Sequence, residues 1–315
     1  MNETTYCRIS EVNKLSDDVS SFKFQSQGQP FTGLEPGAHI DVHLSGNMVR
    51  QYSMFAWSED SMSLTVAVKR EESGRGGSLQ MHQLRVGDGL EIGGPRNNFN
   101  LEQTDCHYTL IAGGIGVTPI YAMASRLKEI GADFRIYYLV QTQAMAAFDT
   151  LFQTLEIGDN YHLHCDDENG LFDLKEVLTQ EPAGGEIYVC GPEPMLNAVL
   201  ESSSALRSGN IHFERFSTTD DLEHDPNQAF DVEIKSSGAV FAIGKDENIL
   251  NVLQDNNIDV DFGCSEGLCG ACIVDVLEGE VDHRDSILTP EEQEQNEMMC
   301  VCVSRAKSKR LVLDL

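Results

Sequence analysis

Five of the nine cysteines in the chain fall between residues 264 and 302, where a metal or redox site would place them. Cys264, Cys269 and Cys272 follow the pattern C-x4-C-x2-C, and Cys302 comes 30 positions after Cys272. Four thiolates at this spacing can hold a [2Fe-2S] cluster. Glycines and other small residues between the cysteines let the loop fold around a negatively charged cluster with its backbone N–H groups toward the sulfurs. The sequence therefore predicts an iron–sulfur centre with these four cysteines as its ligands.

Other interpretations of the cysteines stay open. Zinc is the main alternative metal, but zinc sites usually pair two C-x2-C knuckles, whereas this chain has one knuckle and a single distant partner. Buried structural cysteines are a second alternative, although four at this spacing argue against it. Cys300 competes with Cys302 for the fourth position, because side chains two residues apart in a strand point the same way. We choose Cys302 for its spacing.

Two short motifs in the N-terminal part could bind a phosphorylated cofactor. Arg50-Gln51-Tyr52-Ser53 fits a strand whose alternation sends Arg50 and Tyr52 to one face and Ser53 to the other. This run offers a cation, a ring and a hydroxyl, although an Arg and a Tyr on a strand are more often surface and core residues. The glycine-rich turn at residues 74–78 has N–H groups and a hydroxyl that could hold a phosphate. An ordinary glycine-rich hairpin is the alternative.

Two further glycine-rich turns join a strand to a helix. In residues 112–119 the glycines allow close approach to a pyrophosphate, and the helix N-terminus favours anions. Thr118 suits the N-cap of that helix. Cys190-Gly191-Pro192 opens a second such turn, although Cys190 could instead be a small buried residue. Both turns follow the carboxyl ends of strands, where open α/β sheets bind their ligands.

The elements that must position the first motifs are strands. Period-2 alternation between residues 6 and 101 is clearest at Ile40, Val42 and Leu44, and it predicts half-buried strands. Further strands are expected at 63–69 and 89–92, separated by glycine-rich turns. This pattern predicts an antiparallel sheet or small barrel, and a plain β-domain without a site is the alternative.

From residue 108 onward apolar runs alternate with helical stretches, which predicts a βαβ series and a parallel sheet covered by helices. The expected strands are 109–112, 135–140, 162–165, 186–190 and 211–216, and the expected helices are 119–130, 144–155, 171–179 and 192–206. Residues 217–229 are polar and acidic and are predicted to be a linker. In the last unit, 230–315, we expect a hairpin at 230–243, a helix at 248–255 and strands at 273–277 and 311–315.

The composition restricts the class of protein. A chain of 315 residues is expected to form two or three domains. Asp and Glu number 51 against 22 Lys and Arg, and the net charge of −29 disfavours partners such as nucleic acid or an anionic membrane surface. No apolar run is long enough to cross a bilayer, and the first residues lack the features of a signal peptide. Because the odd number of cysteines also argues against a disulfide framework, we expect a cytoplasmic protein.

On these motifs the last unit resembles a plant-type ferredoxin, and the whole chain resembles the phthalate dioxygenase reductase and vanillate demethylase reductase family. The resemblance implies a multidomain protein with an antiparallel β-barrel flavin domain at 1–104 and an α/β parallel-sheet NAD-binding domain at 105–216. After the linker at 217–229 it implies an α+β ferredoxin domain of the β-grasp type at 230–315. It also implies a reductase that passes electrons from NADH through a flavin and a [2Fe-2S] cluster to a Rieske-type terminal oxygenase.

The resemblance also implies roles for single residues. It places residues 67–69 beside the isoalloxazine ring and the C-G-P element at the nicotinamide. The cofactor-binding residues that it implies are Arg50, Tyr52, Ser53, Ala67, Val68, Lys69, Gly76, Gly77, Ser78, Gly113, Gly114, Gly116, Thr118, Cys190, Gly191 and Pro192. The residues implied at the reacting centre are Ser53, Thr118, Cys190 and Phe216. Phe216 could equally serve interdomain packing.

The sequence favours one of the two common flavins and one of the two nicotinamide cofactors. We expect FMN in preference to FAD, because the loop at 74–78 and Arg50 can bind one phosphate and no adenine platform is evident. We expect NADH over NADPH, because residues 141–145 carry no Lys or Arg for a 2′-phosphate, and Gln141 stands where similar proteins often have Arg. Two other functions stay open. The chain could serve a haem-thiolate monooxygenase or another acceptor, or it could be a redox-sensing protein.

Overall fold

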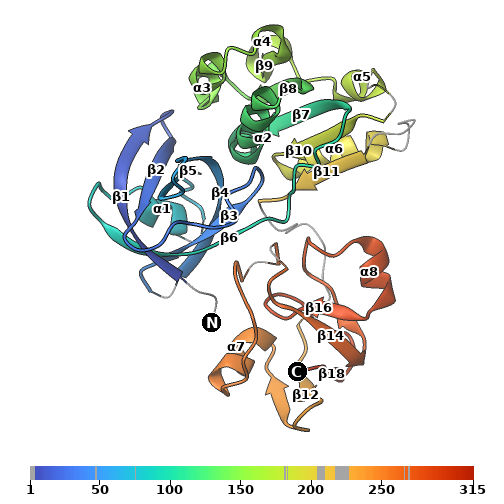
Figure 1. The fold of residues 1–315 in the computed structure, drawn as a ribbon. Coiled ribbons are helices and arrows are strands. Elements are labelled where there is room, and N and C mark those ends of the chain that lie inside the picture. The colour runs from blue at the N-terminus through green and yellow to red at the C-terminus, as the bar shows by residue number, and fades with distance from the viewer. Residues whose placement is uncertain are drawn as a thin grey trace. The chain divides into compact units, whose positions relative to one another are not determined.

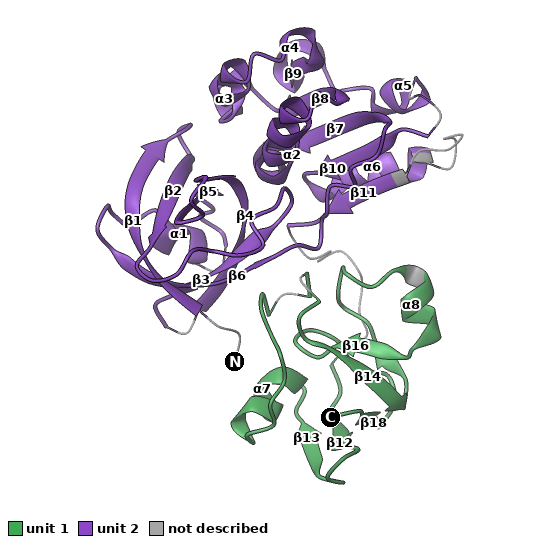
Figure 2. Ribbon diagram, in the orientation of Figure 1, with its two compact units in different colours: residues 1, 217–315 green, residues 2–216 purple. Residues whose placement is uncertain are grey.

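The structure, a computed structural model, describes residues 4–46, 48–74, 76–180, 182, 184–203, 210–216, 227–265, 267–268 and 270–315. The chain divides into two compact units, residues 2–216 and, together with Met1, residues 217–315 (Figure 2). The larger unit holds a barrel and a parallel sheet, and the smaller unit holds a mixed sheet (Figure 1).

The first part of the larger unit is a closed barrel of antiparallel strands, which confirms the predicted fold class (Figure 1). Alternate side chains, among them Phe22, Phe24, Ile40 and Val42, fill its interior, as the period-2 pattern requires. The strands are β1 (Thr4–Lys14), β2 (Val19–Ser26), β3 (His39–Leu44), β4 (Met48–Trp57), β5 (Ser63–Lys69) and β6 (Gly89–Arg96), in the order β1-β2-β5-β4-β3-β6. A short helix, α1 (Gly77–Met81), begins in the glycine-rich loop and buries Met81 in this core.

The second part is a parallel sheet in the order β11-β10-β7-β8-β9, with helices on its faces. Its strands are β7 (His107–Gly113), β8 (Asp133–Val140), β9 (Tyr161–Cys165), β10 (Glu186–Cys190) and β11 (Asn210–Glu214). Its helices are α2 (Val117–Glu129), α3 (Asp149–Thr154), α4 (Asp166–Asn169), α5 (Leu174–Thr179) and α6 (Glu193–Ser203). Every residue of β10 is buried, as expected for a central parallel strand.

Two predicted elements in this sheet differ from the structure. The helix expected at 144–155 is a 3-10 turn at Gln143–Met145 followed by the shorter α3. The strand expected at 211–216 ends at Glu214, so Phe216 lies beyond the strand. In both cases the sequence pattern predicts an element that is too long, because apolar side chains continue past the residues that form the backbone hydrogen bonds.

The barrel and the parallel sheet share a hydrophobic core. The Phe55 ring of β4 lies 5.9 Å from the ring of Tyr121 in α2 and 5.0 Å from that of Phe148. Val19 and Ala67 of the barrel belong to the same buried cluster. These contacts explain why residues 2–216 form one compact unit.

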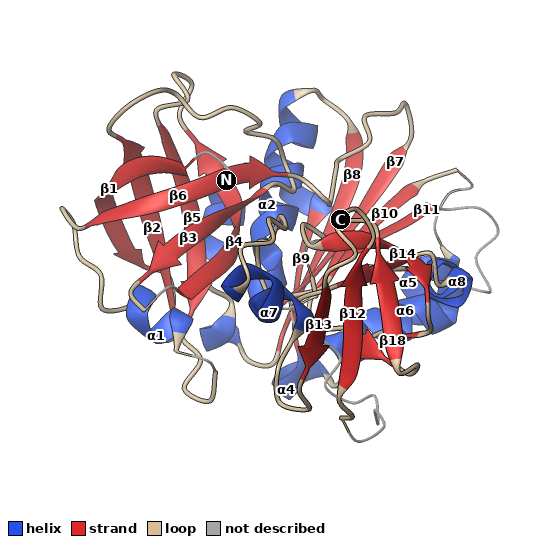
Figure 3. Cartoon of the chain, turned by 90° about the horizontal axis from the view of Figure 1, so that it is seen from below, coloured by secondary structure: helices blue, strands red, loops and turns tan. Residues whose placement is uncertain are grey.

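The smaller unit is a mixed sheet in the order β13-β12-β18-β14-β16, which confirms the predicted β-grasp type (Figure 3). Strands β12 and β18 are parallel, and the other pairs are antiparallel. Helix α7 (Ile249–Asp255) packs Ile249, Leu250 and Leu253 into the core. The remaining elements are β12 (Phe230–Ile234), β13 (Val240–Ile243), β14 (Ile273–Glu278), β15 (Val281–Asp282), α8 (Pro290–Gln295), β16 (Met298–Cys300), β17 (Arg305–Ala306) and β18 (Arg310–Leu313).

Most of the predicted linker, residues 217–226, lies outside the described residues. Asn227 contacts the smaller unit, because its amide donates to the Lys245 carbonyl at 2.9 Å and accepts from Arg284 at 2.7 Å. The exact domain boundaries therefore stay predictions. Within the described parts of the chain, no helix has the length and apolar character needed to span a membrane.

Candidate functional site

Three of the four predicted cluster ligands are buried in the smaller unit. Cys264, Cys272 and Cys302 are each less than 5% exposed, and the Cys272 and Cys302 sulfurs lie 3.1 Å apart. The fourth, Cys269, lies outside the described residues. Among the described residues alone, no group of three or more His, Cys, Asp or Glu side chains could hold a metal ion. The predicted set of four ligands therefore stays a prediction.

The loop between these cysteines directs backbone donors at sulfur, which fits a [2Fe-2S] cluster. The Leu268 N–H donates to Cys264 Sγ at 3.4 Å, and the Gly267 N–H hydrogen bonds to Cys302. Gly267 has a φ of +70°, and a Cβ there would lie 2.6 Å from a methyl carbon of Val303. Only glycine suits this position, because it tolerates the left-handed backbone and the close approach. N–H groups aimed at sulfur stabilise the negative charge of an iron-bound cluster.

Cys302 and its neighbour Cys300 are both buried beside Cys272. Cys302 interacts with Cys272 and also with Cys264, whereas Cys300 interacts with Cys272, Cys302 and Asp285. Cys300 is fully buried in β16, where it pairs with Ile273. Because Cys272 interacts with both neighbours, Cys302 as the fourth ligand stays a prediction.

In the larger unit, the flavin motif and the glycine-rich loop lie against each other. A Cβ on Gly77 would lie 2.5 Å from Arg50 Cγ, so the loop contacts the Arg50 side chain directly. Gly76 precedes α1 with a φ of 85°. The Ser78 hydroxyl accepts a hydrogen bond from the Glu71 N–H at 3.0 Å, which fixes this turn. A guanidinium beside a glycine-rich turn is suited to hold one phosphate.

Residues 67–69, predicted beside the isoalloxazine, end strand β5, and their role stays a prediction. Val68 lies in the barrel core and is 1% exposed, so only its backbone can face a flavin. Ala67 lies in the shared core, and Lys69 forms an ion pair with Glu71 at 2.7 Å. Tyr52 is partly buried against the barrel core, and burial raises the pKa of its hydroxyl.

The two glycine-rich turns of the parallel sheet are in contact. A Cβ on Gly113 would lie 2.6 Å from Pro192 Cδ, and one on Gly191 would lie 2.9 Å from Gly113 Cα. A Cβ on Gly116 would lie 2.3 Å from the Cys190 carbonyl oxygen. The turns meet because β7 and β10 are neighbours and both end here. This edge is where parallel sheets bind nucleotides.

Thr118 is not the N-cap that the sequence predicts. Helix α2 begins at Val117 after a 3-10 turn at Gly114–Gly116, so the chain is already helical when it reaches Thr118. The Thr118 hydroxyl donates to the Ile115 carbonyl at 3.2 Å, and the residue is buried. Thr118 therefore steadies this turn from within.

A carboxylate that the sequence analysis missed joins two predicted residues. Glu214 ends β11, pairs in register with Cys190, and accepts a hydrogen bond from Ser53 Oγ at 3.5 Å. Burial raises the pKa of Glu214 to about 8, although the Ser53 hydrogen bond opposes this rise. Burial, and next the charge of Glu214, raise the pKa of the Cys190 thiol well above its ordinary value. The hydroxyl, the thiol and the carboxyl group are therefore all mainly neutral near pH 7.

Phe216 lies two residues beyond Glu214 and is 38% exposed. No ring pair among the described residues includes Phe216, so its predicted place over a flavin stays a prediction. The position of Glu214 in the sequence could have indicated its role. Glu214 ends β11 as Cys190 ends the neighbouring strand β10, so both lie at the same edge of the sheet.

Three family models match the chain in succession. An oxidoreductase FAD-binding domain matches residues 6–101, and the N-terminal domain of a DmmA-like dimethylamine monooxygenase subunit matches residues 95–209. A 2Fe-2S iron-sulfur cluster binding domain matches residues 232–307. The models therefore support a flavin site in the barrel and an iron–sulfur site in the smaller unit.

Whole proteins of similar length also match. Phthalate dioxygenase reductase of Burkholderia cepacia is 36% identical, over 98% of this chain and 96% of that protein. Vanillate O-demethylase oxidoreductase of a Pseudomonas species is 35% identical, over 98% of each chain. The oxidoreductase NdmD of Pseudomonas putida is 33% identical, and the chain spans only about half, 53%, of its length.

The same relationship holds for solved structures. Phthalate dioxygenase reductase, 35% identical, matches with a TM-score of 0.78 over 99% of this chain and 98% of that one. Full-length CYP116B46 from Tepidiphilus thermophilus matches with a TM-score of 0.81 and 37% identity, but this chain covers 42% of it. Because full-length relatives are reductases of oxygenase systems and share both the fold and the order of the domains, this chain belongs to the phthalate dioxygenase reductase family of NAD(H)-dependent flavin and iron–sulfur oxidoreductases.

Proposed function

We propose that the chain is the reductase of a Rieske-type oxygenase system, supplied with hydride by NADH. The observation that carries this proposal is the likeness to phthalate dioxygenase reductase over the whole chain, at 36% identity. When bound, the flavin takes up two electrons as hydride and releases them singly, while the cluster carries one at a time.

The residues Ser53, Cys190 and Glu214 are proposed to surround the reacting atoms. Cys190 and Glu214 end the neighbouring strands β10 and β11, Ser53 lies within β4, and all three side chains are mainly neutral near pH 7. Hydride transfer brings negative charge into this region, and a buried anion nearby would oppose it. A neutral Glu214, held by the Ser53 hydroxyl, removes that opposition.

The bound flavin is proposed to be FMN. The contact between Gly77 and Arg50 provides a place for one phosphate, and Ser78 steadies the turn that carries it. The matching family model is described as FAD-binding, so the two flavins need a direct test. Mass spectrometry of the flavin released from the purified protein is expected to give FMN, and FAD as the main species would refute this part.

The hydride donor is proposed to be NADH. The Asp167 N–H donates to the Gln141 carbonyl at 3.0 Å, so the acidic helix α4 lies beside the end of β8. Its first turn carries Asp166, Asp167 and Glu168. A 2′-phosphate near Gln141 would meet these carboxylates and no cation from residues 141–145, which favours the cofactor without that phosphate.

Another acceptor is the second candidate. An intact type IV self-sufficient cytochrome P450 monooxygenase matches with a TM-score of 0.83 and 36% identity, and this chain covers 41% of it. A tetrachlorobenzoquinone reductase of Sphingobium chlorophenolicum is 36% identical. A chain of this fold can therefore serve a haem-thiolate monooxygenase or a quinone in place of a Rieske protein.

Two assays separate these functions. Steady NADH-dependent reduction of cytochrome c by the purified chain is expected, and its absence would favour a redox sensor. Reconstitution with purified acceptors then distinguishes a Rieske-type oxygenase from a haem-thiolate monooxygenase. None of the eight described cysteines forms a disulfide bond, which supports the proposal of a reducing compartment such as the cytoplasm.

A further inference from the structure

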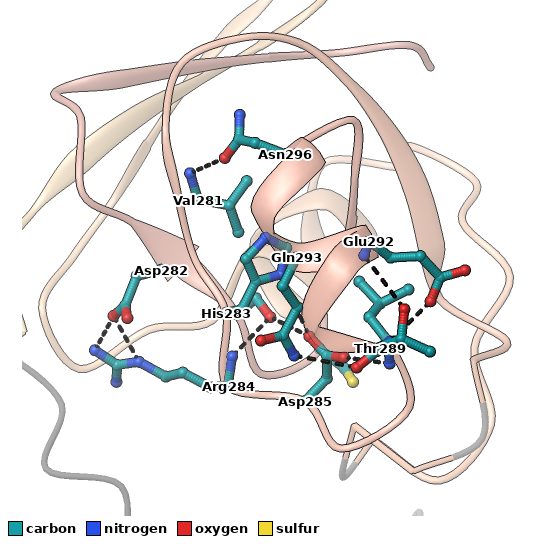
Figure 4. Close-up of polar contacts among 12 residues, drawn as sticks. Val281, Asp282, His283, Arg284, Asp285, Thr289, Glu292, Gln293 and Asn296 are labelled. Atoms are coloured by element: carbon teal, nitrogen blue, oxygen red, sulfur yellow. Dashed lines mark hydrogen bonds and ion pairs between the residues drawn. The ribbon is translucent and has the colours of Figure 1, made fainter. Parts of the chain in front are cut away.

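A buried carboxylate, that of Asp285, lies among polar side chains of the smaller unit (Figure 4). The Asp285 side chain is 0% exposed. The Leu288 N–H donates to its Oδ2 at 2.9 Å, and the Ser304 hydroxyl donates to its Oδ1 at 3.1 Å. His283 Nδ1 lies 3.6 Å from the same Oδ1. Each carboxylate oxygen therefore has a hydrogen-bond donor.

Asp285 lies where two cysteine-bearing segments meet. Ser304, which donates to Asp285, follows Cys302 by two residues, and its N–H donates to the Cys300 carbonyl at 2.9 Å. On the other side, the Ser286 N–H donates to the Gly267 carbonyl at 2.9 Å. A Cβ on Gly267 would lie 3.0 Å from Asp285 Cα. The Asp285 segment thus joins the loop after Cys264 to the segment after Cys302.

His283 can balance the charge on Asp285 only when its ring is protonated. Its neighbour Arg284 turns to Asp282, and in the described residues no Lys or Arg forms an ion pair with Asp285 (Figure 4). Burial raises the pKa of Asp285, but the nearby His283 ring and the hydrogen bonds from the Leu288 N–H and the Ser304 hydroxyl outweigh it and hold the pKa below its ordinary value. The carboxylate is therefore ionised at neutral pH. A charge held in a region with little water acts strongly on its neighbours.

We propose that Asp285 is a positioning residue for the [2Fe-2S] cluster. Asp285 joins the two ligand segments, and its buried negative charge lowers the reduction potential of the cluster. The charge opposes the arrival of an electron, because reduction adds one more negative charge to a cluster that is already anionic. This inference rests on the proposed cysteine ligands, and it does not depend on which acceptor the reductase serves.

The test is the reduction potential of the cluster in the purified holoprotein, followed by EPR during a redox titration. Asp285→Asn keeps the size of the side chain and removes its charge. The equilibrium constant for reduction is expected to rise about tenfold, which is 59 mV for a one-electron couple. The matched control is Glu280→Gln, which removes the same charge from a side chain that is 67% exposed. Water and salt screen Glu280, so the equilibrium constant for reduction of the cluster should change less than about twofold in Glu280→Gln.

Several results would overturn the inference. A potential in Asp285→Asn equal to that of the wild type, or a rise matched by Glu280→Gln, would exclude the charge effect. If Asp285→Asn does not retain a cluster, Ser304→Ala provides the second test, because it removes one donor and keeps the charge. Iron release to a chelator should then be about fivefold faster, and an unchanged rate would contradict the positioning role. A wild-type protein without a [2Fe-2S] signal would refute the proposed function itself.

Discussion

Glu214 provides the sharpest prediction about the flavin region. Its pKa of about 8 lies far above the ordinary 4.5, because the half-buried side chain loses water where it packs beside Ser53 and Cys190. A carboxyl group with a raised pKa is neutral below that pKa and charged above it. The protonated fraction is then about 90% at pH 7 and about 10% at pH 9. If hydride transfer requires the neutral form, its rate should fall about ninefold between these two pH values.

The assay is stopped-flow reduction of the bound flavin by saturating NADH without oxygen, which isolates this step from later electron transfer. Glu214→Gln keeps the hydrogen-bonding shape and cannot ionise, so its rate should be nearly flat from pH 7 to 9. The matched control is Glu186→Gln, at the opposite end of β10, where Glu186 contacts His212 at 2.7 Å. This control should keep the decline of the wild type. A flat wild-type profile, or a Glu214→Gln profile that still falls ninefold, would refute the assigned role of Glu214.

Three other predictions concern the remaining parts of the chain. Cys302→Ser should abolish or greatly weaken the cluster, whereas Cys300→Ser should keep its absorption and EPR signal, and the reverse result would make Cys300 the fourth ligand. The kcat/KM for NADH should exceed that for NADPH at least about tenfold, and Gln141→Arg should narrow this ratio; comparable values in the wild type would exclude the NADH preference. Residues 230–315 hold 18 Asp and Glu against 7 Lys and Arg, so reduction of an oxygenase should slow at least about threefold from low to high salt, and a constant rate would leave this acidity as a solubility feature.

Local patterns predicted most of the fold. The alternation at Ile40 and Val42 predicted barrel strands, because the period of a strand is a property of neighbouring residues. The contact between Gly113 and Gly191 followed from a general rule, since neighbouring parallel strands end at one edge of the sheet. Helix α8 is not predicted from the sequence, because its residues form no apolar stripe of helical period. Thr289 and Glu292 form a capping box, which was a visible signal for its start.

The rest depended on contacts between distant parts of the chain. In the sequence Glu214 and Asp285 look like any of the other acidic residues, and only packing buries Asp285 fully and Glu214 in part. Ser53 reaches Glu214 because the barrel packs on the parallel sheet, an arrangement that no local pattern encodes. Choosing between Cys300 and Cys302 likewise depends on the positions of Cys264 and Cys272.

The path of the electrons is the central claim. The most direct measurement mixes the loaded reductase anaerobically with NADH and purified Rieske-type oxygenases, with a haem-thiolate monooxygenase in parallel, and follows the iron centres by rapid-freeze EPR. We expect the [2Fe-2S] signal of this chain to form first and a Rieske signal to follow at least as fast as turnover. Reduction of the haem-thiolate protein alone, or of a Rieske centre by a Cys302→Ser variant that lacks its cluster, would contradict the account.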